Sequence, residues 1–230
     1  MVSVKNVDKY YGEKESRFQV LKDVNLDISD GDFVVILGAS GSGKSTLLNV
    51  MSGLDKPDGG EILYDDVEIS SLSDGAMTKF RKENVGFVFQ QYYLIASLDV
   101  EKNVKMGADL AGNKNYREMI EAVGLSDKLR KYPSELSGGE QQRVSIARAL
   151  AKDSRYLFMD EPTGALDEKT GRQVLDFISK LHEKIGFTLI MVTHNENIAQ
   201  MANTVVKMNS GEITEIIKNN DIKDAYEIGW

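Results

Sequence analysis

A glycine-rich segment near the start of the chain has the residue types and spacing of a phosphate-binding loop. GASGSGKS, residues 38–45, fits the pattern G-x-x-x-x-G-K-S and lies between the apolar run FVVIL and a helix-like pattern. In such a loop, successive N–H groups point at a phosphate and the helix dipole favours its negative charge. The residues expected to bind a nucleotide here are Gly38, Ala39, Ser40, Gly41, Ser42, Gly43, Lys44, Ser45 and Thr46.

Lys44 and Ser45 end this loop with side chains that suit a nucleotide. We expect the ammonium group of Lys44 to bridge the β- and γ-phosphates and the hydroxyl of Ser45 to ligate Mg²⁺. The alternative is a flexible Gly/Ser loop that only caps a helix. The position between a buried strand and a helix start favours the phosphate site.

A pair of carboxylates follows another apolar run. In YLFMDEP, residues 156–162, four apolar residues precede Asp160 and Glu161, which places both at the edge where doubly wound sheets bind ligands. We expect Asp160 to hold Mg²⁺ and Glu161 to polarise the attacking water, because phosphoryl transfer needs positioning and charge neutralisation. Alone, such a pair is usually a solvated strand end; the phosphate loop favours the catalytic interpretation.

Two further strand ends supply polar side chains to the same edge. His194 ends the run MVTH and is suited to hydrogen-bond a γ-phosphate and the catalytic water. The simpler alternative is a partly exposed histidine at a strand end. Gln90 follows VGFVF, residues 85–89, and is placed to reach Mg²⁺ or the water, although by itself it is a weak signal.

The stretch LSGGEQQRVSIARAL, residues 136–150, resembles a second phosphate site in the same chain. Ser137 and Glu140 have the spacing of a capping box, so we predict a helix that begins at Gly138. Glycine at Gly138 and Gly139 costs about 1 kcal/mol each relative to alanine, and its use is to let a phosphate approach free N–H groups. No residue beside this helix closes a nucleotide site of its own.

The composition narrows the class of protein. The 230 residues include 28 basic and 36 acidic side chains, and the net charge of −8 argues against nucleic acid as a partner. Cysteine is absent, which excludes disulfides and thiolate metal sites. The longest apolar runs fall far short of the roughly 20 residues that a membrane span needs. We therefore expect a cytosolic chain that would need a partner to work at a membrane.

The elements that must position these residues change in type along the chain. Strand patterns dominate residues 1–96, helices follow one another over 97–151, and strands alternate with helices over 152–230. Alternation implies a parallel sheet covered on both faces. We predict one α/β domain: a P-loop NTPase core with a mostly parallel sheet and an N-terminal antiparallel β subdomain (1–96 and 152–230), and an inserted helical subdomain (97–151).

Five motifs occur in an order that resembles the ATP-binding subunit of an ABC transporter: GASGSGKST, VFQQ, LSGGEQQR, YLFMDEPTGALD and VTH. The resemblance covers essentially the whole chain and implies hydrolysis of ATP with Mg²⁺ by two subunits arranged head to tail. In that arrangement Ser137, Gly138, Gly139 and Glu140 of one subunit bind the γ-phosphate held by the other. Asp167, in GALD, would signal across the dimer.

Further features of the family are carried over by the same resemblance. Tyr11 would stack on adenine, and the neighbouring Tyr10 stays open as the alternative. Residues 90–104 would line a groove for a membrane subunit, although the apolar residues 92–95 could equally be core. The implied partners are a second ATPase subunit, identical or homologous, and an integral membrane permease that holds the chain at the cytoplasmic face of the membrane.

Within the family, the sequence is most similar to subunits of macrolide exporters, lipoprotein-releasing systems and antimicrobial-peptide resistance pumps. One departure is Glu140, where glutamine is commoner; a capping box tolerates glutamate. Two functions are left open by the residues. One is ATP-driven export or release of a peptide, lipoprotein or antimicrobial compound. The other is regulation of a membrane protein without transport, such as control of a cell-wall hydrolase or antibiotic sensing.

Overall fold

The N-terminal part of the chain forms a four-stranded antiparallel sheet in the computed structural model, which describes residues 1–230. Apolar and exposed residues alternate along its strands, as expected for a sheet with one buried face. Tyr11 and Phe18 pair at the end of the first hairpin, so its connecting loop is shorter than the polar sequence indicates. The order is β2-β1-β4-β5, with β1 Val2–Tyr11, β2 Phe18–Ile28, β4 Gly59–Tyr64 and β5 Val67–Glu68.

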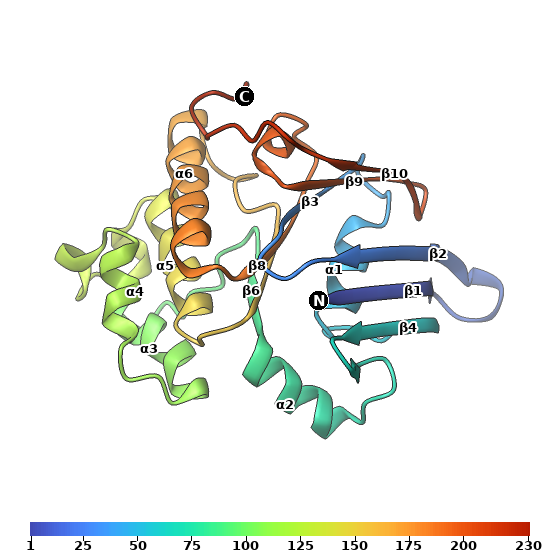
Figure 1. The fold of residues 1–230 in the computed structure, drawn as a ribbon. Helices are drawn as coiled ribbons and strands as arrows, with labels where there is room; N and C mark the ends of the chain where they lie inside the picture. Colours follow the sequence, from blue (N-terminus) through green and yellow to red (C-terminus); the bar gives the residue numbers. More distant parts are fainter.

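A second sheet of six strands forms the centre of the molecule (Figure 1). Its pairings are parallel except for the antiparallel pair β9–β10. All residues of β3 and β8 are buried, because both faces of the sheet are covered. The order is β10-β9-β3-β8-β7-β6, with β3 Phe33–Leu37, β6 Val85–Val88, β7 Tyr156–Asp160, β8 Thr188–Thr193, β9 Thr204–Asn209 and β10 Glu212–Lys218.

Six α-helices and four short 3₁₀ turns connect the strands. The α-helices are α1 Lys44–Met51, α2 Asp74–Asn84, α3 Val100–Ala111, α4 Tyr116–Ala122, α5 Gly138–Leu150 and α6 Glu168–Ile185. The 3₁₀ turns are η1 Lys14–Ser16, η2 Ser126–Lys128, η3 Pro133–Glu135 and η4 Ile198–Met201. The sequence did not predict α2, because only Met77 and Phe80 in it are buried. None of the helices combines the length and apolar character needed to cross a membrane.

Three hydrophobic clusters hold these elements together. One joins the antiparallel sheet, α1 and α2 to one face of the central sheet, and a second packs α5 and α6 on the other face. A third cluster lies among α3, α4 and α5, away from the antiparallel sheet (Figure 1). The predicted α/β class is therefore confirmed: an antiparallel N-terminal sheet, a mostly parallel central sheet and a separate group of helices.

Candidate nucleotide-binding site

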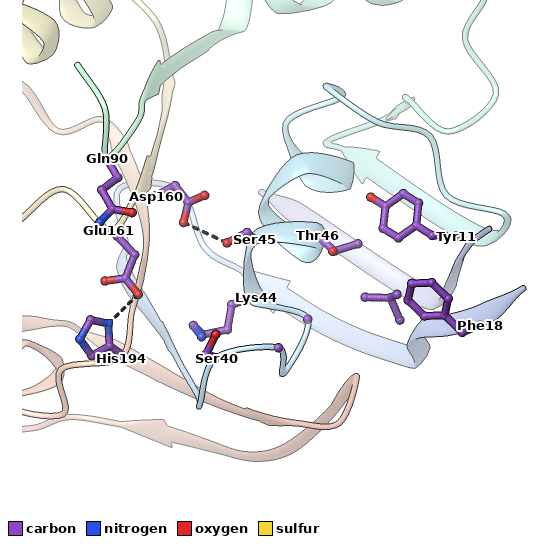
Figure 2. A pocket seen from close by; sticks show the side chains of 13 residues that line it. Tyr11, Phe18, Ser40, Lys44, Ser45, Thr46, Gln90, Asp160, Glu161 and His194 are labelled. Carbon is purple, nitrogen blue, oxygen red and sulfur yellow. Dashed lines mark hydrogen bonds and ion pairs between the residues drawn. The ribbon is translucent and has the colours of Figure 1, made fainter. Parts of the chain in front are cut away.

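A cavity of about 760 Å³ opens at the carboxyl ends of the parallel strands, within the range of small-molecule sites (Figure 2). The sequence singled out all of its lining residues except Phe18 and Val20. The lining consists of Tyr11, Phe18, Val20, Ser40, Gly41, Gly43, Lys44, Ser45, Thr46, Gln90, Asp160, Glu161 and His194. Side chains from both sheets thus meet in one site, since Tyr11 and Phe18 come from the antiparallel sheet and the acidic pair from the central one.

The phosphate loop connects β3 to α1 and depends on its glycines. Gly41 and Gly43 have φ values of 78° and 99°, conformations that favour glycine. A Cβ atom at Gly38 would lie 2.4 Å from the carbonyl oxygen of Met208, so the loop passes too close to β9 for any side chain. The loop therefore has the tight backbone curvature that an anion-binding concavity requires.

The side chain of the lysine folds back onto the phosphate loop. Lys44 is buried, and its Nζ donates a hydrogen bond of 2.9 Å to the carbonyl oxygen of Ala39. The hydroxyl of Ser42 is buried with no hydrogen-bond partner. A cation and an unused hydroxyl are thus held within the loop, both suited to phosphate oxygens.

Ser45 and Asp160 form the part of the site suited to Mg²⁺. The Ser45 hydroxyl donates to Asp160 Oδ1 at 3.1 Å (Figure 2). Burial raises the pKa of the Asp160 carboxyl, and the hydrogen bond from Ser45 opposes that shift. Mg²⁺ in nucleotide sites typically takes one or two protein oxygens and completes its shell with water and phosphate. These two oxygen donors fit that chemistry, and Gln90 lines the same cavity.

Glu161 and His194 are held against one another beside the phosphate loop. Glu161 Oε1 lies 2.9 Å from Nδ1 of His194, and the Thr193 hydroxyl donates to Oε2 at 3.4 Å. The backbone of Glu161 has a φ of 47°, which costs a non-glycine residue on the order of 1–3 kcal/mol. Its N–H donates to the carbonyl oxygen of Val192 at 3.0 Å, a bond that helps hold this conformation. The sequence predicts that His194 hydrogen-bonds a γ-phosphate and the catalytic water; its contact with Glu161 is an additional interaction that the sequence did not indicate.

The two neighbouring tyrosines differ in their position relative to the cavity. Tyr11 lines the cavity, donates from its hydroxyl to Asp55 Oδ2 at 2.8 Å, and has the ring of Phe18 6.4 Å away. Tyr10 lies outside the lining, and its ring stacks under the guanidinium of Arg17. Phe18 went unnoticed because it follows a charged run; the signal for it was the pairing of two strands across a short turn.

The LSGG segment lies outside this cavity, as does Asp167. The capping box is confirmed: α5 begins at Gly138, the Ser137 hydroxyl accepts from the Glu140 N–H at 3.4 Å, and Glu140 accepts from the Ser137 N–H at 2.9 Å. Lys128 pairs with the Glu140 carboxylate, and this hydrogen bond lowers the pKa of Glu140. Asp167 caps α6 by accepting from the Thr170 N–H at 3.1 Å.

The two glycines of this segment have different surroundings. A Cβ atom at Gly138 would meet only side-chain ends, with Tyr92 Oη nearest at 3.0 Å. A Cβ atom at Gly139 would lie 2.1 Å from Cγ2 of Thr170 on α6. Sequence reasoning gave both glycines to an approaching phosphate. Gly139 therefore also packs closely against α6, a contact that the sequence did not indicate because Thr170 is distant along the chain.

Two side chains of α5 connect the helices to the strand ends. Arg148 donates to the carbonyl oxygens of Tyr92 and Tyr93, just beyond Gln90. Gln142, which is fully buried, donates from Nε2 to the carbonyl oxygen of Pro162 at 2.7 Å. The helix that begins with the LSGG segment is therefore tied to the residues that follow Gln90 and Glu161.

The family model for ABC transporters matches residues 21–164 of the chain. The chain belongs to the ABC transporter family. Its α/β fold is that of an ABC ATPase, and it is an ATPase of this family. A solved dimeric ATP-binding cassette in a post-hydrolysis state, bound to ADP and Pi, is 40% identical with a TM-score of 0.86, over 95% of this chain and 98% of that one.

Relatives of this ABC ATPase differ in how much of their length it spans. An uncharacterized ABC transporter ATP-binding protein of Methanocaldococcus jannaschii is 46% identical over 94% of this chain and 99% of its own length. A macrolide export ATP-binding/permease protein of Aggregatibacter actinomycetemcomitans is 42% identical over 99% of this chain. Only 36% of that longer protein is covered, so the match is to one part of it.

Proposed function

We propose that this ABC ATPase binds MgATP in the cavity and hydrolyses it as a head-to-tail dimer. The observation that carries this proposal is that the predicted phosphate-binding residues lie in two separate places on the chain. The cavity contains the phosphate loop and the acidic pair, whereas Ser137, Gly138 and Asp167 lie outside it. A second copy in the opposite orientation supplies the missing contacts, and a related cassette has been solved as a dimer.

The residues of the cavity have distinct roles in this reaction. Lys44 and the loop N–H groups neutralise the β- and γ-phosphates, and Ser45, Asp160 and Gln90 would hold Mg²⁺, which would supply further positive charge to the phosphates. Glu161 orients the attacking water and accepts its proton, while His194 fixes the carboxylate at 2.9 Å and reaches the γ-phosphate as the site closes.

The charges around the LSGG segment are compatible with binding of the γ-phosphate of an ATP held by the partner subunit. The first-turn N–H groups of α5 and the Ser137 hydroxyl suit an anion. Glu140 brings a negative charge into this turn, but Lys128 is paired with it. The pair is close to neutral, so glutamate in place of the commoner glutamine need not repel a γ-phosphate.

The proposal also includes a partner, an integral membrane permease. Tyr93 is 62% exposed and Ile95 39%, while Tyr92 and Leu94 are partly buried. Two apolar side chains on the segment after Gln90 thus form a surface suited to a membrane subunit. A similar cassette from Clostridium perfringens, 27% identical, is described as part of an ABC transporter complex. The chain is then peripheral, at the cytoplasmic face of the membrane.

Similarity to macrolide export proteins favours export of an antimicrobial compound, a peptide or a lipoprotein. Regulation of a membrane protein without transport uses the same ATPase residues and is the second candidate. Co-purification of the tagged chain from detergent-solubilised membranes identifies the integral partner. A transport assay in vesicles with that partner then separates export from regulation.

The dimer is tested with Glu161→Gln, which removes the proton acceptor but keeps the shape of the side chain. We expect this variant to elute as a dimer with saturating MgATP and as a monomer with ADP. Lys44→Ala in the same background should stay monomeric at all ATP concentrations tested. A Glu161→Gln protein that binds ATP but stays monomeric would contradict the head-to-tail mechanism.

A further inference from the structure

The segment 221–230, which we call the strap, follows β10 and passes over the first turns of α6 (Figure 1). Ala225 and Ile228 in the strap are buried in the hydrophobic cluster that contains Val174 and Leu175 of α6. The strap is therefore packed onto the helix that Asp167 caps. It lies outside residues 21–164, the part that the family model matches.

Polar and aromatic contacts fix the strap to α6 at two adjacent residues. Arg172 Nη1 donates to the carbonyl oxygens of Ala225 and Ile228, both at 2.8 Å. The ring of Trp230 lies 5.7 Å from the Arg172 guanidinium. The same ring covers Gly171 so closely that a Cβ atom there would lie 1.9 Å from it.

The other side of the strap contacts the segment that follows His194. The Lys223 N–H donates to the carbonyl oxygen of Gln200 at 3.0 Å, and Lys223 Nζ donates to Gln200 Oε1 at 2.9 Å. Gly229 packs against Asn197, whose Nδ2 would lie 2.9 Å from a Cβ atom at Gly229. The strap thus joins the segment after His194 to the start of α6.

We infer that the strap is a positioning element for the ATPase: it fixes Asp167 relative to the segment that follows His194. The backbone carbonyl oxygen of Asp167 accepts the Gly171 N–H at 2.8 Å, so the residue under Trp230 is one helical turn from Asp167. This inference rests on the proposed function, since Asp167 and His194 act together only in a closed dimer. No strap residue lines the nucleotide cavity, so binding of ATP to a single chain should not depend on the strap.

Trp230→Ala tests the strap by removing the ring from Gly171. We expect kcat for ATP hydrolysis to fall about tenfold, because small misplacements of catalytic groups cost up to about 100-fold. The Kd of a fluorescent ATP analogue, measured at protein concentrations that keep the chain monomeric, should change less than about twofold. In the Glu161→Gln background, Trp230→Ala should raise the ATP concentration needed for dimerisation about tenfold.

Three further variants separate positioning from stability. Gly171→Ala drives a methyl group into the ring and displaces the strap; we expect the same fall in kcat, with a smaller fall in Tm than in Trp230→Ala because alanine favours the helix. Ile222→Ala is the matched control, since Ile222 is an exposed strap residue; its kcat should stay at the wild-type value. Trp230→Phe should recover part of the activity.

Each outcome bears on one of the two proposals. A wild-type kcat in both Trp230→Ala and Gly171→Ala would overturn the strap inference while leaving the dimer intact. A lower Tm with unchanged kcat would also overturn it, because the strap would then only stabilise the fold. If Glu161→Gln alone does not dimerise with ATP, the proposed function fails before the strap is tested.

Discussion

Arg148 on α5 donates from Nη1 to the carbonyl oxygen of Tyr93 at 2.6 Å, across the boundary between the helices and the central sheet. Its Nη2 donates to the carbonyl oxygen of Tyr92 at 2.9 Å. Tyr93 has a φ of 44°, so the guanidinium holds a strained piece of backbone. Burial lowers the pKa of Arg148, because desolvation disfavours the charged guanidinium.

Replacing Arg148 by methionine should therefore weaken both the fold and the catalysis. Two charge-assisted hydrogen bonds are lost, and we expect the free energy of unfolding to fall by about 2–4 kcal/mol, measured by urea denaturation. The kcat should fall too, because the segment after Gln90 loses its link to α5. Lys105→Met, which removes an exposed pair with Asp109, should change stability by less than about 0.5 kcal/mol. Equal effects of the two variants would refute the link.

The two glycines of the LSGG segment should respond differently to alanine. Gly139→Ala drives a methyl group into Thr170 Cγ2, so we expect a loss of about 1–3 kcal/mol of stability. Thr170→Ser removes that methyl and should restore much of the loss in the double variant, a coupling that a double-mutant cycle measures. Gly138→Ala should leave stability nearly unchanged but weaken ATP-dependent dimerisation. Additive losses at Gly139 and Thr170 would contradict the contact.

The neighbouring tyrosines provide a matched pair for the base site. Tyr11→Ala removes a ring that lines the cavity, and stacking of a base on an aromatic ring is worth about 1–3 kcal/mol. We expect the KM for ATP to rise about tenfold or more. Tyr10→Ala removes a ring that stacks with Arg17 and should leave KM within about twofold. Steady-state kinetics of the two variants decide the assignment, and a larger effect at Tyr10 would reverse it.

The half-buried carboxyl of Asp160 predicts an unusual stability effect. Burial raises its folded pKa above the ordinary value of 3.8, so the charged form is less favourable in the folded chain than in the unfolded chain. The stability from this group is fully present below the unfolded pKa and is lost as the pH rises through the folded pKa. Asp160→Asn should therefore raise the Tm of the nucleotide-free protein at neutral pH, by an amount that shrinks as the pH is lowered.

The effect of MgATP on the Tm provides a second test of the role of Asp160. MgATP should raise the Tm of the wild-type protein through its preference for the folded state. In Asp160→Asn this rise should shrink, because the carboxylate that would hold Mg²⁺ is gone. Thermal unfolding at neutral pH and at lower pH values down to the ordinary pKa of 3.8 measures both effects. A lower Tm of the nucleotide-free variant at neutral pH would count against the buried charge.

The parts of the site that the sequence predicted are those in which one local pattern specifies the position. The phosphate loop, Asp160 and His194 each follow an apolar run, and strand ends meet at one edge of a parallel sheet. The parts that it missed depend on partners distant in sequence. Phe18 enters the cavity only because β2 pairs with β1. Hydrophobic periodicity carries no information about such pairs.

The same limit applies to the contacts that tune the site. Lys128 lies beside Glu140 only once η2 has packed near the start of α5. Trp230 reaches Gly171 from a distant part of the chain. Each depends on tertiary packing that sets two distant segments side by side, and no local propensity specifies it. The sequence therefore predicts the reactive residues of the site but not the tertiary contacts that position them.

The two ends of the cavity come from different sheets, which separates recognition of the base from recognition of the phosphates. At the antiparallel end the lining consists of Tyr11, Phe18 and Val20, two rings and an aliphatic side chain. Rings stack on any purine or pyrimidine face, and none of these three side chains offers an amide or carboxylate to read a base edge. In the proposed binding mode, the enzyme is therefore more selective for the triphosphate group than for the base of the nucleotide. Its turnover in a cell would then follow the whole nucleoside triphosphate pool.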